Sequence, residues 1–462
     1  MRFNTNVLRL VSCLYIIGVL SYTPTVLYLP ALTFSQVTGF GVYTITIIVS
    51  LICVVYTCIG GFKAVIWTDA LQFAVMIGSM LAVVIIGIIS AGGFSMVWKE
   101  AINGQRLDIF DFSFDPTLRD SFWSTFIGNF FFLISITSAN QSSMQKYLAL
   151  SDFKKVKNCM IIHFTGIVII KLITAATGIV AYANYAHCDP FLSNKITKPD
   201  QLMPYFVMDT TRNLPGLPGL YIAGIFCAAL STLSTSLNTT SACIYQDIIL
   251  PFLSRDITEE CRTKILKVIV VVLGTVSVLL VIVIEQVGGI FAFSTLIQGI
   301  SGGPLLGILL LGILFPIATT KGALIGGATG LTFSTWIIAG NLWYKSQGLL
   351  RYEEKPASVE NCTTSTDSNL KLIEFDKNDV FILYRISFWY YCAISTIMVI
   401  ISGIIASWFT KKDNVTINSD LLSPVMHRFL TKVEHSDDCV YYDLEKANVL
   451  VNSKGSDKIT VR

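Results

Sequence analysis

Long apolar runs alternate with short polar segments along this chain of 462 residues. Ten of the runs are long enough to cross the ~30 Å hydrocarbon core of a bilayer as α-helices. They cover about residues 8–32, 39–60, 64–90, 121–145, 157–184, 216–246, 264–286, 289–316, 320–342 and 380–409. The pattern therefore predicts an all-α, polytopic membrane protein with about ten transmembrane helices.

The composition supports this class and indicates two regions. Hydrophobic residues make up 53% of the chain, charged residues only 14%, and the mean hydropathy is +0.65, values outside the range of soluble proteins. The first run opens directly after Met1-Arg2-Phe3 without a small-residue cleavage site, so we interpret it as a span and not as a signal peptide. We expect a transmembrane domain over residues 1–410 and a disordered polar tail over 411–462.

The charges between the runs predict the orientation of the spans, because cytoplasmic loops carry the excess of Lys and Arg. With the amino terminus inside, the cytoplasmic loops and their borders contain Lys63, Lys146, Lys154, Lys155, Lys157, Arg255, Arg262, Lys264, Lys267, Lys321, Lys411 and Lys412. The long loops 91–120, 185–215 and 343–379 then lie outside, and both termini are cytoplasmic. The glycosylation acceptor at Asn361 falls outside, and the one at Asn414 falls inside, where it should be silent.

Most of the eleven cysteines lie in apolar spans, where they are simplest to interpret as small buried residues: Cys13, Cys53, Cys58, Cys227, Cys243 and Cys392. Cys188 and Cys362 lie in polar loops instead. These two can pair if both loops face an oxidising compartment.

One apolar segment, Gly219 to Ile249, carries an unusual polar stretch. Its residues 231–241 contain eight hydroxyl side chains and one amide. At 3.6 residues per turn, one helical face collects Ala228, Ser231, Thr232, Thr235, Asn238 and Thr239. Such a face allows close helix packing with hydroxyls bonded back to their own helix. It equally fits a cation site, because hydroxyl and carbonyl oxygens can replace the water shell of a small hard ion.

Two charged residues fall inside spans, where charge is expensive. Asp69 opens span three with polar neighbours Thr68 and Gln72 on its face, and is either an interfacial carboxylate or a group that handles ions. Lys171 lies near the middle of span five. It snorkels, pairs with another group, or faces a cavity and favours an anionic substrate.

The glycine-rich run Gly302-Gly303-Pro304 lies within span eight, and indicates either a broken or closely packed helix or only the ordinary glycine of membrane helices. An enzyme is not predicted. The four histidines are scattered, and no catalytic triad, metal-ligand spacing or phosphate-binding loop occurs.

Several stretches carry a family resemblance: Gln36-Val37-Thr38-Gly39-Phe40, Gly60-Gly61-Phe62-Lys63-Ala64-Val65-Ile66-Trp67-Thr68-Asp69, Cys188-Asp189-Pro190 with Asp200-Gln201-Leu202-Met203-Pro204-Tyr205, and residues 214–220. From about residue 2 to 410 the chain resembles the sodium/solute symporter family, in its branch of sodium-coupled monocarboxylate and multivitamin transporters. The resemblance implies an inverted-repeat, LeuT-like bundle in the plasma membrane. It implies symport of sodium and a small organic anion, either a monocarboxylate or a carboxylate vitamin, by alternating access. No organic cofactor and no nucleic-acid partner are expected.

Carried over residue by residue, the resemblance implies a shared sodium site at Ala228, by its carbonyl, with Ser231 and Thr232. It implies a possible second sodium site at Asp69, Ser234 and Thr235. The substrate cavity corresponds to span four, with Thr137, Ser138, Asn140, Gln141 and Gln145, and Lys171 is a further candidate. The amides of span four fit a helix-packing network equally well.

In one respect the chain departs from the family pattern, because it begins at what resembles the third helix of the first repeat. Spans one to three would complete the first half of the inverted repeat, spans four to eight the second, and spans nine and ten would be appended. Three oxygens from one helix are too few for a dehydrated cation. We therefore expect this chain alone not to transport, and the alternative is a truncated, non-transporting membrane protein or an incomplete gene model.

Overall fold

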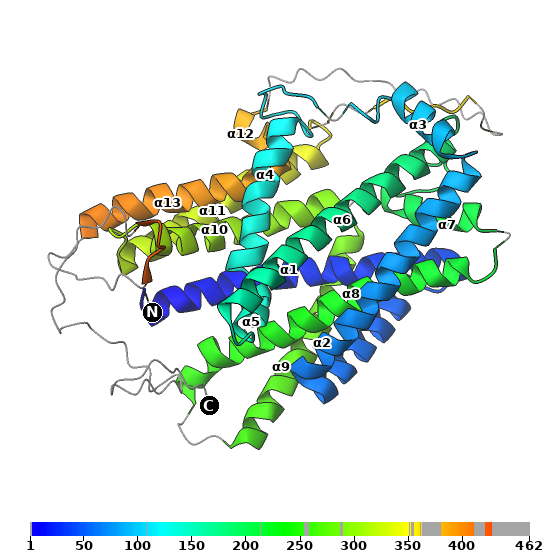
Figure 1. Ribbon diagram of the computed structural model, residues 1–462. Coiled ribbons are helices and arrows are strands. Elements are labelled where there is room, and N and C mark those ends of the chain that lie inside the picture. Colours follow the sequence, from blue (N-terminus) through cyan, green and yellow to red (C-terminus); the bar gives the residue numbers. More distant parts are fainter. Residues whose placement is uncertain are drawn as a thin grey trace.

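The computed structural model describes residues 2–108, 110–212, 214–253, 258–286, 290–350, 352, 355–360, 362, 380–410 and 421–426. These residues form helices and connecting loops, without a strand (Figure 1). Ten stretches of described helix are long and apolar enough to cross a membrane. They overlap the ten predicted spans one by one, so the prediction of an all-α, ten-span architecture is confirmed.

The described helices divide into long and short ones. The long ones are α1 (Thr5–Thr38), α2 (Val42–Ser90), α4 (Phe122–Ile134), α6 (Phe153–Tyr185), α8 (Leu217–Cys243), α9 (Glu259–Glu285), α10 (Ile290–Leu314), α11 (Thr320–Ser346) and α13 (Tyr391–Thr410). The short ones are α3 (Phe94–Asn103), α5 (Gln141–Leu148), α7 (Leu202–Thr210) and α12 (Ile382–Arg385). Side-chain caps begin several of them, as at Asn4, which accepts hydrogen bonds from the N–H groups of Asn6 and Val7.

Helix α2 contains two spans, because its 49 residues would extend about 74 Å if straight. Tyr56 in its first half donates to the carbonyl of Leu230 (2.9 Å), and Asp69 in its second half accepts from Ser231 (2.6 Å). Leu230 and Ser231, neighbours on α8, thus contact the two halves of α2. These two halves lie side by side in Figure 1. The two halves are joined at the Gly60-Gly61 pair, where the chain reverses (Figure 1).

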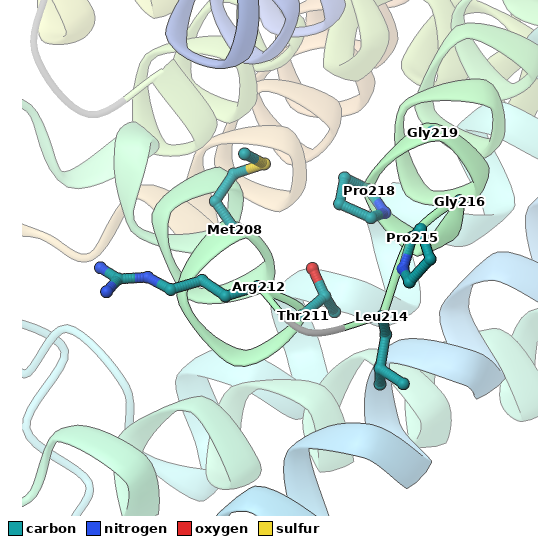
Figure 2. Close-up of a pocket in the computed structure, with 8 residues that line it drawn as sticks. All are labelled: Met208, Thr211, Arg212, Leu214, Pro215, Gly216, Pro218 and Gly219. Atoms are coloured by element: carbon teal, nitrogen blue, oxygen red, sulfur yellow. The ribbon is translucent and has the colours of Figure 1, made fainter.

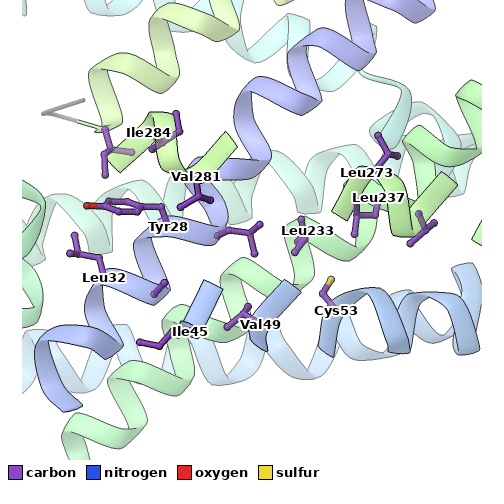
Figure 3. Packing of buried hydrophobic residues seen from close by; sticks show 14 of the residues in the cluster. Tyr28, Leu32, Ile45, Val49, Cys53, Leu233, Leu237, Leu273, Val281 and Ile284 are labelled. Atoms are coloured by element: carbon purple, nitrogen blue, oxygen red, sulfur yellow. The ribbon is translucent and has the colours of Figure 1, made fainter. Parts of the chain in front are cut away.

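Helices α1, α2, α8 and α9 share the largest apolar core (Figure 3). Its buried members include Tyr28, Leu32, Ile45, Val49, Cys53, Leu233, Leu237, Leu273, Val281 and Ile284. The leucines of the polar stretch of α8 therefore face this core. Their burial orients α8 so that its hydroxyl row turns toward α1 and the second half of α2.

Helices α10, α11 and α13 pack closely because α10 has no side chain at two of its contacts. A Cβ on Gly303 would lie 2.5 Å from the Ser395 Cβ, and one on Gly307 would lie 2.6 Å from the Val399 Cβ. Helix α10 continues through Pro304. The run Gly302-Gly303-Pro304 is therefore a packing surface, and the broken-helix interpretation of span eight is wrong.

The three long loops that we predicted to lie on one side meet at one end of the bundle. A disulfide joins Cys188 to Cys362, with 5.1 Å between their Cα atoms. The Asp189 N–H donates to the Ser358 carbonyl (2.9 Å), and Arg106 donates to the Pro356 carbonyl (2.9 Å). The sequence left open whether Cys188 and Cys362 pair, and the structure joins them. The acceptor Asn361 lies outside the described residues.

The opposite end of the bundle holds the start of α1 and a piece of the tail. Arg2 donates to the carbonyls of Pro316 (2.8 Å) and Ala318 (2.9 Å), just beyond the end of α10. In the tail, Leu422 is buried and the Ser423 N–H donates to the Ile313 carbonyl (3.1 Å). Residues 421–426 therefore contact the bundle, whereas 411–420, including Asn414, and 427–462 lie outside the described residues.

Candidate functional site

Asp69 is the centre of the most polar contact between spans. Its Oδ1 accepts from the Ser231 hydroxyl (2.6 Å), and its Oδ2 accepts from the Thr235 hydroxyl (3.3 Å) and from the Lys146 ammonium (3.2 Å). The Asp69 side chain is 19% exposed and that of Lys146 is 40% exposed. The carboxylate, on α2, thus has a charged partner from α5 and two neutral donors from α8.

Local helix geometry accounts for each of these positions. Ser231 and Thr235 are four residues apart on α8 and therefore point to the same side. Asp69 follows the reversal of α2 and is placed beside α8 by that turn. Lys146 comes from the last turn of α5, a short helix that begins after Asn140.

Gln72 lies three residues after Asp69, on the same face of α2. Its Oε1 is buried and has no hydrogen-bond partner in the described structure. A buried acceptor without a donor costs about 1–3 kcal/mol, so it needs a structural or functional explanation. An amide oxygen is also a ligand that hard cations accept.

The three residues predicted for the shared sodium site are not oriented alike. The Thr232 hydroxyl donates to the Ala228 carbonyl within the same helix (2.9 Å), whereas Ser231 turns toward Asp69. Of the second predicted set, Thr235 contacts Asp69, and the fully buried Ser234 donates to the Ser231 carbonyl (3.1 Å). The structure thus joins Ser231 and Thr235 at Asp69, leaves Ala228 and Thr232 in a contact within α8, and places Ser234 beside Tyr56 of α2.

Span four is broken where its amides are concentrated. After α4 the chain forms a π-helical turn, Ser135–Ala139, and Asn140 then adopts an extended backbone (φ −80°, ψ 124°) before α5 begins at Gln141. The Asn140 side chain accepts from the Ser142 N–H (2.9 Å), and the Ser143 hydroxyl bridges the break to the Ile136 carbonyl (2.9 Å). Non-helical backbone at membrane depth occurs where it is buried in protein or lines a cavity.

The other predicted cavity residues divide into two groups. Thr137 and Ser138 lie at the break, and their hydroxyls donate to the carbonyls of Leu133 and Ile134, each at 2.6 Å. Lys171 does not join them. Its side chain is exposed on α6, beside Leu172, which is 65% exposed. The structure therefore does not bring Lys171 to the break in span four.

Two residues of the site, Lys146 and Gln72, could not be assigned their contacts from the sequence. Lys146 was only a loop charge, and no local signal could reveal a partner 77 positions away. Gln72 was noted only as a polar neighbour of Asp69. Its spacing from the carboxylate was visible in the sequence, but its unpaired oxygen was not.

A surface hollow of about 450 Å³ lies elsewhere, between the end of α7 and the start of α8 (Figure 2). It is lined by Met208, Thr211, Arg212, Leu214, Pro215, Gly216, Pro218 and Gly219. The Arg212 guanidinium extends away from it and pairs with Asp209 (3.1 Å). Ser231 lies more than three helical turns further along α8, so the hollow is separate from the Asp69 contact.

Comparisons with known proteins identify relatives over most of the chain. Residues 1–330 match the Sodium:solute symporter family. The human sodium-coupled monocarboxylate transporter 2 is 35% identical over 435 residues, which cover 93% of this chain and 70% of that protein. The human sodium/iodide cotransporter is 32% identical over 431 residues, covering 89% of this chain and 67% of that protein.

Among solved structures, a substrate-bound, outward-open Na⁺-coupled sialic acid symporter matches with a TM-score of 0.66. The match covers 88% of this chain and 75% of the symporter, at 23% sequence identity. This likeness shows the fold alone, and it agrees with the LeuT-like bundle that the sequence predicts.

Proposed function

The chain belongs to the sodium:solute symporter family, and on that premise we propose that it couples sodium entry to the uptake of a small organic anion by alternating access. The anion is a monocarboxylate or a carboxylate vitamin. The observation that carries this proposal is the intramembrane carboxylate of Asp69, surrounded by oxygens from α2 and α8.

The Asp69 contact has the chemistry of a sodium site. Sodium is a hard cation, and carboxylate, hydroxyl and amide oxygens can replace its water shell. Asp69, Ser231, Thr235 and Gln72 supply these oxygens, and the Lys146 ammonium contacts one of them. Sodium and Lys146 therefore compete for the carboxylate, so that one positive charge replaces another. In this proposal the shared sodium site at Ala228, Ser231 and Thr232 adjoins the Asp69 site through Ser231.

The break at Asn140 is the proposed substrate position. An anion is favoured there because the first N–H groups of α5 point toward the break and carry the positive end of the helix dipole. Thr137, Ser138, Asn140, Gln141 and Gln145 surround this position in the sequence. Two relatives are named for a monocarboxylate and for iodide, and both of these ligands are monovalent anions.

Helix α5 connects the two proposed sites. Asn140 precedes its first turn, and Lys146 from its last turn contacts Asp69. Sodium binding at Asp69 would release Lys146 and free one end of α5, whose other end contacts the anion. The ion's binding free energy can thereby stabilise the substrate-competent arrangement.

The proposed setting is the plasma membrane, with both termini in the cytoplasm. Two observations support it: the three long loops meet at one end, and two of them are joined by the Cys188–Cys362 disulfide, a bond favoured by an oxidising compartment. Arg2 and Ser423 contact the opposite end of the bundle.

The direct test is uptake into proteoliposomes that contain the purified chain. Three oxygens from α8 alone led us to expect no transport by this chain, but Asp69 and Gln72 add oxygens from α2. On this proposal we therefore expect a sodium gradient, but not a potassium gradient, to drive saturable uptake of lactate, biotin or pantothenate. Asp69→Asn should weaken the sodium dependence, whereas Asp108→Asn, at an exposed loop position, should not. Folded protein without sodium-driven uptake of any anion would instead support the non-transporting alternative.

A further inference from the structure

Helix α8 continues its polar row beyond the Asp69 contact to a second carboxylate. Ser231, Thr235, Thr239 and Cys243 recur at every fourth position of α8, and Asp247 follows four residues later, in the π-helical turn Ile244–Ile249 that continues it. Residues at this spacing form one continuous ridge on a helix. The ridge extends for about 24 Å at 1.5 Å per residue, with Asp69 bound at one end and Asp247 at the other.

Helix α1 covers the far half of this ridge with polar side chains of its own. The Tyr15 and Thr239 hydroxyls are hydrogen-bonded (2.9 Å). One turn earlier on α1, the Ser12 hydroxyl donates to Asp247 Oδ2 (2.5 Å), which also accepts from the Cys243 thiol (3.4 Å). Polar groups therefore line the contact between α1 and α8 from Thr239 to Asp247.

Thr240 is the second and independent observation at this contact. Its side chain is 0% exposed, and among the described residues its hydroxyl makes no hydrogen bond of good geometry, the Tyr15 hydroxyl being its polar neighbour. The hydroxyl lies beside that of Tyr15, which bonds to Thr239. A buried hydroxyl without a partner is costly, and a cation or water molecule passing along the contact can satisfy its oxygen.

The charge of Asp247 has no counter-ion among the described residues. No described lysine, arginine or histidine lies within ion-pair distance of it. Arg9, three residues before Ser12 on α1, lies with its guanidinium over the Phe252 ring (5.6 Å), and Arg262 pairs with Glu259 (3.6 Å). Asp247 is only half-buried and belongs to a π-helical turn, Ile244–Ile249, a local geometry common at functional positions.

We propose that Asp247 and Ser12 form a second cation-binding site, at the end of the bundle opposite the Cys188–Cys362 disulfide. A sodium ion rests there between the Asp69 site and the water beyond Asp247. This inference rests on the proposed function, because it assumes that sodium reaches Asp69. The two carboxylate oxygens and the Ser12 hydroxyl are hard ligands, and water at the half-exposed side of Asp247 completes the shell.

If sodium binds at Asp247, substitutions there should change the rate of sodium exchange without changing sodium binding at Asp69. We would measure exchange of radioactive sodium across proteoliposomes, and sodium-dependent protection against thermal unfolding in detergent. Asp247→Asn should slow exchange about tenfold, the effect of ~1.4 kcal/mol, while protection by sodium persists. Ser12→Ala should slow exchange less, and Asp247→Glu should restore most of the rate.

Matched controls are Ser21→Ala on α1 and Asp108→Asn in an outer loop, both expected to exchange sodium at the wild-type rate. Wild-type exchange in both Asp247→Asn and Ser12→Ala would overturn the proposal and leave Asp247 as a tie between α1 and α8. Exchange that follows pH and not sodium concentration would also overturn it, because a proton would then occupy the carboxylate. Loss of sodium protection in wild type itself would contradict the proposed function instead.

Discussion

The ammonium of Lys146 lies 3.2 Å from the carboxylate of Asp69, which is 77 residues earlier in the chain. This ion pair connects α5, the helix that follows the break in span four, to α2. The contact places the only charged partner of Asp69 among the described residues on the segment that begins at the proposed substrate position. Any cation that binds Asp69 must compete with this ammonium.

Removal of the ammonium should therefore strengthen sodium binding. We expect Lys146→Met to lower the half-saturating sodium concentration about tenfold, since a competitor worth ~1.4 kcal/mol is lost. The protein should also become less stable without sodium, because Asp69 loses its counter-charge. Sodium titrations of uptake and of thermal unfolding measure both effects. Lys154→Met, at an exposed position of α6, is the control, and a higher half-saturating concentration in Lys146→Met would contradict competition.

A substitution at Gln72 can distinguish a sodium ligand from a structural residue. Its Oε1 makes no hydrogen bond to any described residue, so Gln72→Leu should leave the sodium-free stability unchanged or raise it by about 1 kcal/mol. The same change should weaken sodium-dependent protection several-fold if the oxygen is a ligand. Unfolding temperatures with and without sodium test this. A variant that is destabilised equally in both conditions would show that Gln72 is structural.

The break in span four can be tested at Asn140. Asn140→Ala removes the cap on the Ser142 N–H and should cost about 1 kcal/mol of stability. If the break holds the anion, KM for the anion should rise while the sodium dependence at saturating anion stays near that of wild type. Asn129→Ala, which removes an ordinary contact within α4, serves as the control. Equal kinetics for the two variants would favour the helix-packing interpretation of the amides.

The disulfide should stabilise the protein from the outer side. Its two cysteines are 174 residues apart, and loss of such a cross-link typically costs about 2–4 kcal/mol. A reductant that does not cross membranes should therefore lower the unfolding temperature of the protein in intact cells. Cys188→Ser should reproduce this effect, and Cys261→Ser, which removes an exposed free thiol, should not. Resistance to the external reductant, with sensitivity to a permeant one, would reverse the proposed orientation.

Glycosylation gives an independent measure of the orientation. Asn361→Gln should abolish a mobility shift that depends on glycan removal, because the acceptor is expected outside and adjoins Cys362. Asn414→Gln should leave the shift unchanged. A shift that depends on Asn414 and not on Asn361 would place both termini outside.

Much of the architecture follows from local sequence. Ten apolar runs predict ten spans because lipid offers no hydrogen bonds, so each span must satisfy its own backbone as a helix. The intramembrane carboxylate of Asp69 and the hydroxyl stretch of α8 were equally visible, since polar groups at membrane depth are rare and costly. The polarity of their loops was enough to identify Cys188 and Cys362 as a candidate disulfide pair.

Only the packing of the helices decided which of these groups meet. The sequence places the hydroxyls of Ser231, Thr232 and Thr235 on one helical face, and the rotation of α8 on its leucine core directs only Ser231 and Thr235 to Asp69. Lys171 lies on the exposed side of α6, away from the break in span four. The close contact of α10 with α13 explains why position 303 is a glycine, without a broken helix. Local sequence determines that a helix forms, because its hydrogen bonds are local. Contacts between residues 77 or 162 positions apart depend on the rotation and crossing of whole helices, which only their mutual packing sets.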